Sequence, residues 1–318
     1  MSTKRQIIET TRNASRRLFG RNRWVGSLTE RQLGYILVLP TILVVAAIVV
    51  FPLFYSLYLG FHSTTGIAAE MSWVGLDNYV QMANSSEFWT SFWNNMIWAF
   101  GTLTVQIVLG VSIALLLNRE FRGRNIARGA VLFPYMVPTI VGVFIFRWMF
   151  NSTYGVINYF LVAIPVVIEE PISFFSADLA MFTAILLGVW RFTPFVIIVV
   201  LARLQTIPQG LYEAAKIDGA YRFAQFRHVT LPQLYNILVI VVLLRGVWML
   251  YMFDVIWMLT EGGPGTSSQI LPVYAYREAF RGLNFGYGAA IANVMFIGLI
   301  VFGFLYLRQF HNKEGDHV

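Results

Sequence analysis

Cysteine is absent from this 318-residue chain, and charged residues make up only 12% of it. Without cysteine there can be no disulfide, no thiolate metal site and no thiol catalysis. With so little charge the chain cannot cover a soluble protein of this size with a polar surface. The four histidines are scattered in expected loops and tails, so we expect surface residues rather than metal ligands; they are His62, His228, His311 and His317.

Motifs that carry chemistry are also missing. The sequence has no G-x-x-x-x-G-K-[ST] phosphate-binding loop, no G-x-S-x-G nucleophile elbow and no H-E-x-x-H zinc motif. Nothing in it can cradle nucleotide phosphates in the usual way, and no catalytic group stands out. We therefore expect a non-enzymatic protein without a metal or cofactor of its own.

Hydrophobic residues, in contrast, make up 57% of the chain. A run of about 20 apolar residues is long enough to cross the roughly 30 Å apolar core of a bilayer as a helix. The pattern predicts an all-α integral membrane protein with six transmembrane helices between residues 33 and 307, a basic arm at residues 1–32 and a tail at residues 308–318. The expected spans are Leu33–Phe61, Trp93–Leu117, Arg128–Phe150, Ala180–Leu204, Tyr235–Trp257 and Ala289–Leu307.

The formal charge of +7 is unevenly distributed. Eighteen of the 23 Lys and Arg lie in the arm, the tail and the two loops after the second and fourth spans. The alternate loops hold only Arg277 and Arg281, and the other three arginines lie within spans. Because cytoplasmic loops carry the excess of Lys and Arg, both termini are predicted to be cytoplasmic. The basic arm is then a topology signal and a contact with membrane lipid, and no nucleic-acid partner is expected.

The predicted cytoplasmic loop at residues 207–234 contains "EAAKIDGAYRFAQFRHVTLP", Glu213–Pro232. Pro208 ends the fourth span, two helical turns follow as far as Asp218, and Gly219 breaks them. The second half has the apolar stripe of a helix lying at a membrane surface. The first half, with its acids and paired alanines, does not fit that role. From the residues alone, an interfacial helix and a docking site for a cytoplasmic partner are equally open.

The segment resembles the EAA loop of binding-protein-dependent ABC importers, in which E-A-A-x-x-x-G is followed at a fixed distance by I-x-L-P. Val229 replaces the usual isoleucine, and the remaining positions match. In that family the loop is a coupling helix that inserts into a cleft of an ATPase subunit. The resemblance implies that the ATPase-coupling residues are Glu213, Ala214, Ala215, Asp218, Gly219, Leu231 and Pro232.

Further stretches are similar to the sugar-uptake branch of these permeases, of the maltose and glycerol-phosphate kind. They include "WRFTPF" at Trp190–Phe195 and "FDVIWMLTEGGPGTSS" from Phe253, where Glu261 replaces a glycine that is usual in the family. The resemblance implies a multi-pass subunit of the bacterial inner membrane. Its expected partners are a second homologous permease, two ATPase subunits of which this chain contacts one, and an extracytoplasmic solute-binding protein.

Polar and aromatic residues within spans are the candidates for a substrate pathway, because intramembrane polar groups are costly and default to a functional role. On a straight fifth helix Asp254 would face away from Arg245, nine residues earlier. The alternative is that Arg191 and Arg245 are structural, bonded to kinked backbone or to the partner permease, and we favour this for Arg245. The candidate pathway residues are Arg191, Arg245, Trp248, Tyr251, Asp254 and Asn151.

The sequence thus predicts a permease subunit of an ATP-driven importer for a sugar or a sugar-like solute, such as a polyol, an oligosaccharide or a phosphorylated or sulfonated derivative. A secondary transporter is the alternative, although Asp254 lies too near the outer end of its span to serve easily as a coupling acid. A membrane-embedded scaffold would need no lined pathway. Whether the solute is anionic stays open, because mid-membrane arginines also occur in relatives that carry neutral sugars.

Overall fold

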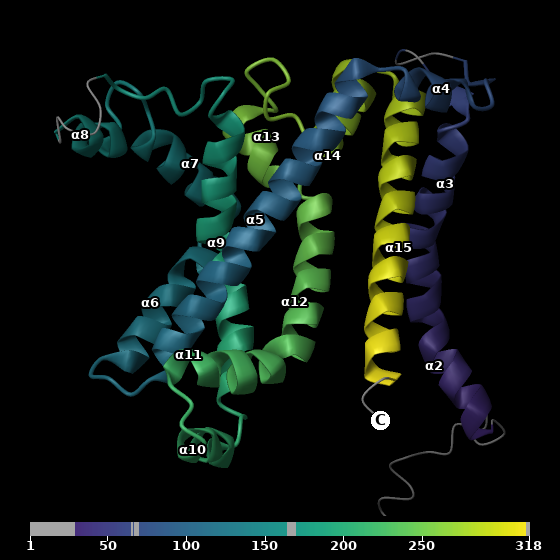
Figure 1. The fold of residues 1–318 in the computed structure, drawn as a ribbon. Helices are drawn as coiled ribbons and strands as arrows, with labels where there is room; N and C mark the ends of the chain where they lie inside the picture. The colour runs from purple at the N-terminus through teal and green to yellow at the C-terminus, as the bar shows by residue number, and fades with distance from the viewer. Residues whose placement is uncertain (1–28, 65, 67–69, 164–169, 316–318) are drawn as a thin grey trace, which may run out of the picture. The chain divides into compact units, whose positions relative to one another are not determined.

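The computed structural model describes residues 29–64, 66, 70–163 and 170–315, and most of the expected basic arm lies outside them (Figure 1). The described chain is mostly helical. Its elements are α2 (Glu30–Val45), the π-helical turn η1 (Ala46–Val50), α3 (Phe51–Leu59), β1 (His62–Ser63), β2 (Ser72–Trp73), α4 (Asp77–Ala83), α5 (Ser86–Asn118), α6 (Arg124–Met136), α7 (Thr139–Met149), α8 (Val156–Ala163), α9 (Ala180–Leu204), α10 (Gln209–Ile217), α11 (Arg222–Gln225), η2 (Phe226–Thr230), α12 (Leu231–Leu250), α13 (Asp254–Thr260), α14 (Leu271–Tyr276), η3 (Arg277–Arg281) and α15 (Phe285–Gly315).

The chain divides into two compact units, Met1–Tyr55 and Ser56–Val318. The described part of the first unit is helical from α2 to the first turn of α3. Its start is set by a capping box, in which the Gln32 backbone N–H donates to the Thr29 hydroxyl and the Thr29 N–H donates to the Gln32 side chain. Such reciprocal bonds satisfy donors that a helix start otherwise leaves free. All the sites discussed below belong to the second unit.

Within the described residues, five helices are long and apolar enough to cross a membrane, and a bent pair brings the number to six if it forms one span. The prediction of an all-α protein with about six spans is therefore confirmed, while the side of the membrane that each terminus faces stays a prediction. The observed helices are Arg31–Leu59, Ser86–Asn118, Ala180–Leu204, Arg222–Leu250 and Phe285–Arg308, and the bent pair is Arg124–Met136 with Thr139–Met149.

The third span is not the single straight helix that the apolar run Arg128–Phe150 suggested. Helices α6 and α7 meet at 95°. Val137, between them, has an extended backbone, as expected for a residue that precedes proline, here Pro138. The guanidinium of Arg191 on α9 donates to the Val137 carbonyl, which the bend leaves without a helical partner. A proline and an arginine from another span therefore make the break.

The fifth span also differs from its prediction, because α12 ends at Leu250 and α13 begins anew at Asp254. The expected continuous helix Tyr235–Trp257 is wrong, and so is the reasoning that placed Asp254 by straight-helix geometry. No proline or glycine marks the break. Two side chains of α5 stabilise the break: Asn95 donates to the Leu250 carbonyl and Trp98 to the Met249 carbonyl, each at a distance of 3.1 Å.

Helices α5 and α9 form the most extensive helix pair and carry the core of the second unit. Small residues allow the approach. A Cβ atom at Gly110 would lie 2.5 Å from a methyl of Val196, and one at Gly188 would lie 2.7 Å from the Trp98 ring. Helices in membranes rely on such close packing because the hydrophobic effect between them is weak.

The second unit has two distinct ends (Figure 1). Helix α10, the α5–α6 loop and the C-terminal part of α15 gather at one end, which we call the inner end after the charge-based topology. The opposite, outer end holds α4, α13, α14 and the two-residue antiparallel pair β1–β2. His62 lies there and is 5% exposed, with its ring bonded to the Tyr58 carbonyl at 2.8 Å. The expected surface position is thus wrong for His62, whereas His228 is exposed.

We predict that Gly110→Ala weakens the α5–α9 pair. The new methyl would collide with the β-branched Val196, whose side chain has little freedom to move, and overpacking of this kind costs about 1–3 kcal/mol. Thermal unfolding of the purified, detergent-solubilised protein should show a lower midpoint. The matched control is Gly129→Ala on α6, where nothing lies within 4 Å of the added atom. Equal midpoints for the two variants would contradict the packing argument.

Candidate functional site

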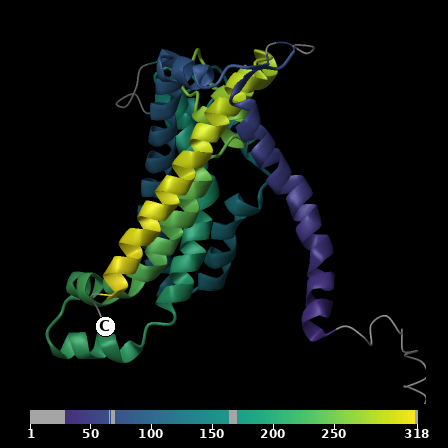
Figure 2. The same ribbon diagram turned by 90° about the vertical axis from the view of Figure 1, so that its right-hand side faces the viewer.

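The inner end of the second unit carries an exposed segment, the coupling segment, which we define as Pro208–Pro232. Helix α10 projects beyond the inner ends of α9 and α12 in both views (Figure 1, Figure 2). None of its residues is buried. Ile217 is 87% exposed, and Tyr221 and Phe223 beyond it are 71% and 61% exposed. Exposed apolar side chains gathered in this way are typical of a surface that another protein covers.

The turn after α10 explains the glycine in its motif. Gly219 has φ +80°, a left-handed conformation that residues with a Cβ rarely adopt. The Ala220 N–H donates to the Ala215 carbonyl at 2.8 Å and the Gly219 N–H to the Lys216 carbonyl at 3.0 Å, which closes the helix end. A Cβ at Gly219 would meet nothing within 4 Å, so backbone conformation and not space requires the glycine.

The coupling segment is tied to the spans on both sides. The Tyr212 hydroxyl of α10 lies 3.1 Å from that of Thr230, a buried residue in η2. Arg203, near the end of α9, donates to the backbone and side-chain oxygens of Gln233 at 2.9 and 3.0 Å. The helix that begins at Arg222 runs through η2 into α12 without interruption. Helix α10 is thus joined to η2 and so to α12, and α9 is joined to α12 beside it.

The predicted coupling residues fall into two groups. Four are exposed on α10 and its C-terminal turn, while Ala215 is half-buried between them. Leu231 and Pro232 lie elsewhere, exposed where the π-helical turn η2 continues into α12. The motif therefore covers two separate places, helix α10 with its C-terminal turn and the junction between η2 and α12. The exposed four are Glu213, Ala214, Asp218 and Gly219.

Arg245 is fully buried on α12. Its Nε donates to the Gln106 side-chain oxygen of α5 at 3.2 Å. The guanidinium lies 4.6 Å from the centre of the Phe192 ring and 5.3 Å from that of Trp248, close enough for cation–π attraction. No acidic residue forms a salt bridge with it in the described chain. Sequence reasoning missed Gln106, because a single glutamine in an apolar run shows no partner.

The other predicted pathway residues lie at the two helix breaks. Arg191 is half-buried and holds the α6–α7 bend, and Asp254 is the first residue of α13. Tyr251 is 48% exposed in the break between α12 and α13. Trp248 is half-buried, with its ring 5.8 Å from that of Phe195 on α9.

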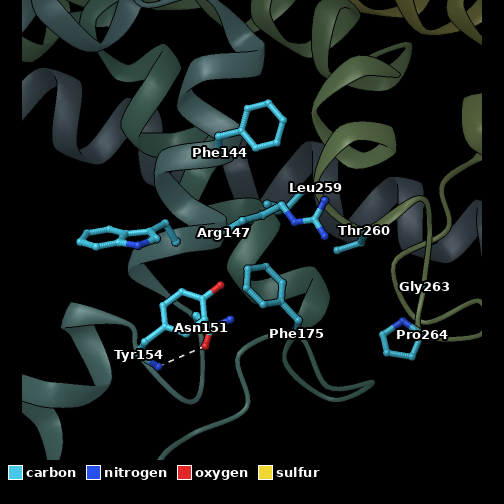
Figure 3. Close-up of a pocket in the computed structure, with 10 residues that line it drawn as sticks. Phe144, Arg147, Asn151, Tyr154, Phe175, Leu259, Thr260, Gly263 and Pro264 are labelled. Carbon is cyan, nitrogen blue, oxygen red and sulfur yellow. Dashed lines mark hydrogen bonds between the residues drawn. The ribbon is translucent and has the colours of Figure 1, made fainter.

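Asn151, the remaining candidate, lies apart from these residues in an open cleft of about 710 Å³ at the outer end (Figure 3). The cleft lies between α7 with the turn after it and the loop Thr260–Pro264. The Asn151 side-chain oxygen accepts hydrogen bonds from the backbone N–H groups of Thr153 and Tyr154 at 2.8 and 3.2 Å. Its first role is therefore to shape the turn after α7.

The loop on the other side of the cleft is held by its own polar contacts. The Thr260 and Ser268 hydroxyls lie 2.7 Å apart, and Ser268 also donates to the Gly263 carbonyl at 2.8 Å. Glu261 has φ +55°, which explains why glycine is usual at this position. Its carboxylate forms a 2.7 Å ion pair with Arg281. The cleft therefore has a preformed wall.

We predict that Gln106→Leu destabilises the protein because it leaves the buried Arg245 without its side-chain acceptor. Loss of a hydrogen bond to a charged group costs about 1.5–3 kcal/mol. The double variant Gln106→Leu/Arg245→Leu should lose less stability than the two single variants together, since neither partner is then left unpaired. Unfolding in denaturing detergent measures the stability of the unaltered protein, the two single variants and the double variant. Ser112→Ala, at an exposed position on α5, is the control. Strict additivity of the two losses would show that the pair is not coupled.

Comparison with known proteins shows which family shares this sequence. Residues 106–313 match the model of the family described as binding-protein-dependent transport system inner membrane component. The trehalose/maltose transport system permease protein MalF of Thermococcus litoralis is 35% identical over 88% of this chain and 94% of its own. The sulfoquinovosyl glycerol transport system permease protein SmoG of Agrobacterium fabrum is 34% identical over 92% of this chain and 94% of its own.

The fold matches a solved structure of a bacterial ABC transporter involved in the import of the acidic polysaccharide alginate. That chain has a TM-score of 0.77, 21% identity, and coverage of 91% of this chain and 98% of its own. The matched segment of the family model contains the entire coupling segment and both broken spans. The chain therefore belongs to the binding-protein-dependent transport system inner membrane components, as a multi-pass inner membrane protein.

Proposed function

We propose that this chain is one of two permease subunits in an ATP-driven importer for a sugar or a sugar-like solute. The observation that carries the proposal is the coupling segment: a helix without buried residues, ended by a left-handed glycine and joined through Tyr212 to the turn η2 that continues into α12. A helix that served only as an interfacial anchor would direct its apolar side chains to lipid and would need no such connection to a span.

The sugar class is supported by the relatives. The two relatives described above are named for trehalose/maltose transport and for sulfoquinovosyl glycerol transport. They match this chain over nearly their full length, so the likeness covers the spans as well as the coupling loop. These cargoes differ from each other, and the comparison therefore supports a class of solute and not one sugar.

The proposed mechanism uses the connections at the inner end. ATP binding closes a pair of ATPase subunits. One of them holds α10 of this chain, and the other contacts the second permease. The displacement passes through the Tyr212–Thr230 contact into η2 and α12, and through the hydrogen bonds between Arg203 and Gln233 to α9. It turns the path from inward-open to outward-open. An extracytoplasmic binding protein then delivers the solute. This chain contributes coupling geometry and half of the path, and it performs no chemistry.

Within the path we assign two kinds of role. Arg191 and Arg245 are structural, because their guanidinium groups are engaged with a freed carbonyl and with Gln106. Trp248, Tyr251 and Asp254, at or beside the α12–α13 break, contact the solute as it passes. Aromatic faces stack on sugar C–H groups, and a carboxylate accepts hydrogen bonds from hydroxyls. Asn151 belongs to the outer cleft.

We predict that Ala214→Arg prevents the ATPase from co-purifying with the chain, because a long charged side chain on the small-residue face of α10 blocks close approach. The tagged chain is gently solubilised from its native membrane, and its partners are identified by mass. The second permease should still arrive. The control Asn125→Arg adds the same charge to an exposed residue at the inner end, outside the coupling segment, and should retain both partners. Recovery of the unaltered chain alone would refute the importer proposal.

We also predict that Tyr251→Ala slows solute uptake several-fold while assembly stays intact. Removal of one aromatic contact costs roughly 1 kcal/mol, which corresponds to about a fivefold change. Uptake of a labelled sugar by cells that express the variant gives the rate, and the co-purification above gives the assembly. Phe304→Ala, an exposed aromatic residue on α15, serves as the control. If uptake kinetics are unchanged, Tyr251 does not line the path.

A further inference from the structure

The outer cleft has more hydrogen-bond donors to offer than acceptors. Arg147 of α7 is exposed, and no hydrogen bond or ion pair engages its guanidinium within the described residues. In Figure 3 its side chain extends from α7 toward Thr260 across the cleft. A guanidinium offers five N–H donors in a fork that matches the two oxygens of an acidic group.

The remaining polar groups point to the same preference. The acceptor oxygen of Asn151 is already occupied by two backbone N–H groups, so its free amide nitrogen can only donate. The Thr260 hydroxyl is engaged with Ser268 and with the Ile256 carbonyl. Neither Asp nor Glu lines the cleft in the described part of the chain. A neutral sugar, whose hydroxyls both donate and accept, would find few side-chain acceptors here.

The apolar surface of the cleft suits the rest of such a ligand. Phe144, Trp148 and Tyr154 line it and are 60%, 59% and 64% exposed. Exposed aromatic faces of this kind can stack on the C–H faces of sugar rings. The volume of about 710 Å³ falls in the range of ligand sites and exceeds the need of a single small ion.

We propose that the outer cleft is a binding site for an anionic saccharide, with Arg147 holding its carboxylate, sulfonate or phosphate and the aromatic residues holding its ring. The proposal rests on the proposed sugar-import function and adds the charge of the solute. The site lies at the outer end, beside the loop Thr260–Pro264, where a solute is received before it enters the path.

The test uses the intact transporter, co-purified with its partners and placed in nanodiscs of phosphatidylcholine. Saturation-transfer NMR titrations compare two probes of the same size, cellobiose and cellobiouronic acid. A charge-assisted contact predicts that the acid binds about tenfold more tightly. In Arg147→Gln the two probes should bind equally, while Arg119→Gln, which removes the same charge at the inner end, should keep the preference. Equal binding by the unaltered protein, or an unchanged preference in Arg147→Gln, would overturn the proposal.

Anionic lipid headgroups share the chemistry of the proposed ligand, so the titration is repeated in phosphatidylglycerol nanodiscs. Undiminished binding of the acid supports a saccharide site, whereas its loss would identify a lipid headgroup as the occupant and overturn the proposal. The co-purified partners distinguish failure of the importer function from failure of the anionic site. An intact assembly without acid preference leaves the importer function standing and removes the anionic saccharide. If a chain that binds no ATPase still prefers the acid, the anionic site stands and the importer function is refuted.

Discussion

Two of the six spans are broken, and the rest of the second unit depends on how their freed backbone carbonyls are satisfied. In an apolar environment an unpaired carbonyl costs several kcal/mol, and no water is present to bond it. Arg191 bonds the carbonyl at the α6–α7 bend, while Asn95 and Trp98 bond those at the end of α12. The donors come from the two unbroken helices α9 and α5. Helices α5 and α9 thus act as the frame on which the broken spans are set.

The same frame accounts for the buried charge. A guanidinium inside a membrane protein is costly, and Arg245 has no carboxylate to neutralise it among the described residues. It is held by one amide oxygen and by ring faces from α9 and α12. These contacts require α5, α9 and α12 to keep their mutual positions. The charge therefore ties α5, α9 and α12 together.

Function divides between the two ends of this frame. The inner end presents an exposed helix joined to η2 through Tyr212, beside the Arg203–Gln233 hydrogen bonds between α9 and α12, which suits the proposed transmission of movement. The outer end presents a preformed cleft between α7 and the Thr260–Pro264 loop, which suits the proposed reception of a solute. The helix breaks of both spans lie between the two ends.

The sequence by itself determined the apolar spans, the charge asymmetry and the coupling motif, because each depends on neighbouring residues. The length and composition of a span are local properties, and so is the position of Gly219 at the end of its helix. Only the tertiary structure decided where spans break, since the break after Leu250 has no proline or glycine and is secured by Asn95 and Trp98 from another helix. It also decided the pairing of Gln106 with Arg245, 139 positions apart, and the outer cleft. Long-range hydrogen bonds leave no periodic trace in a sequence, so these features could be read only once the helices were packed.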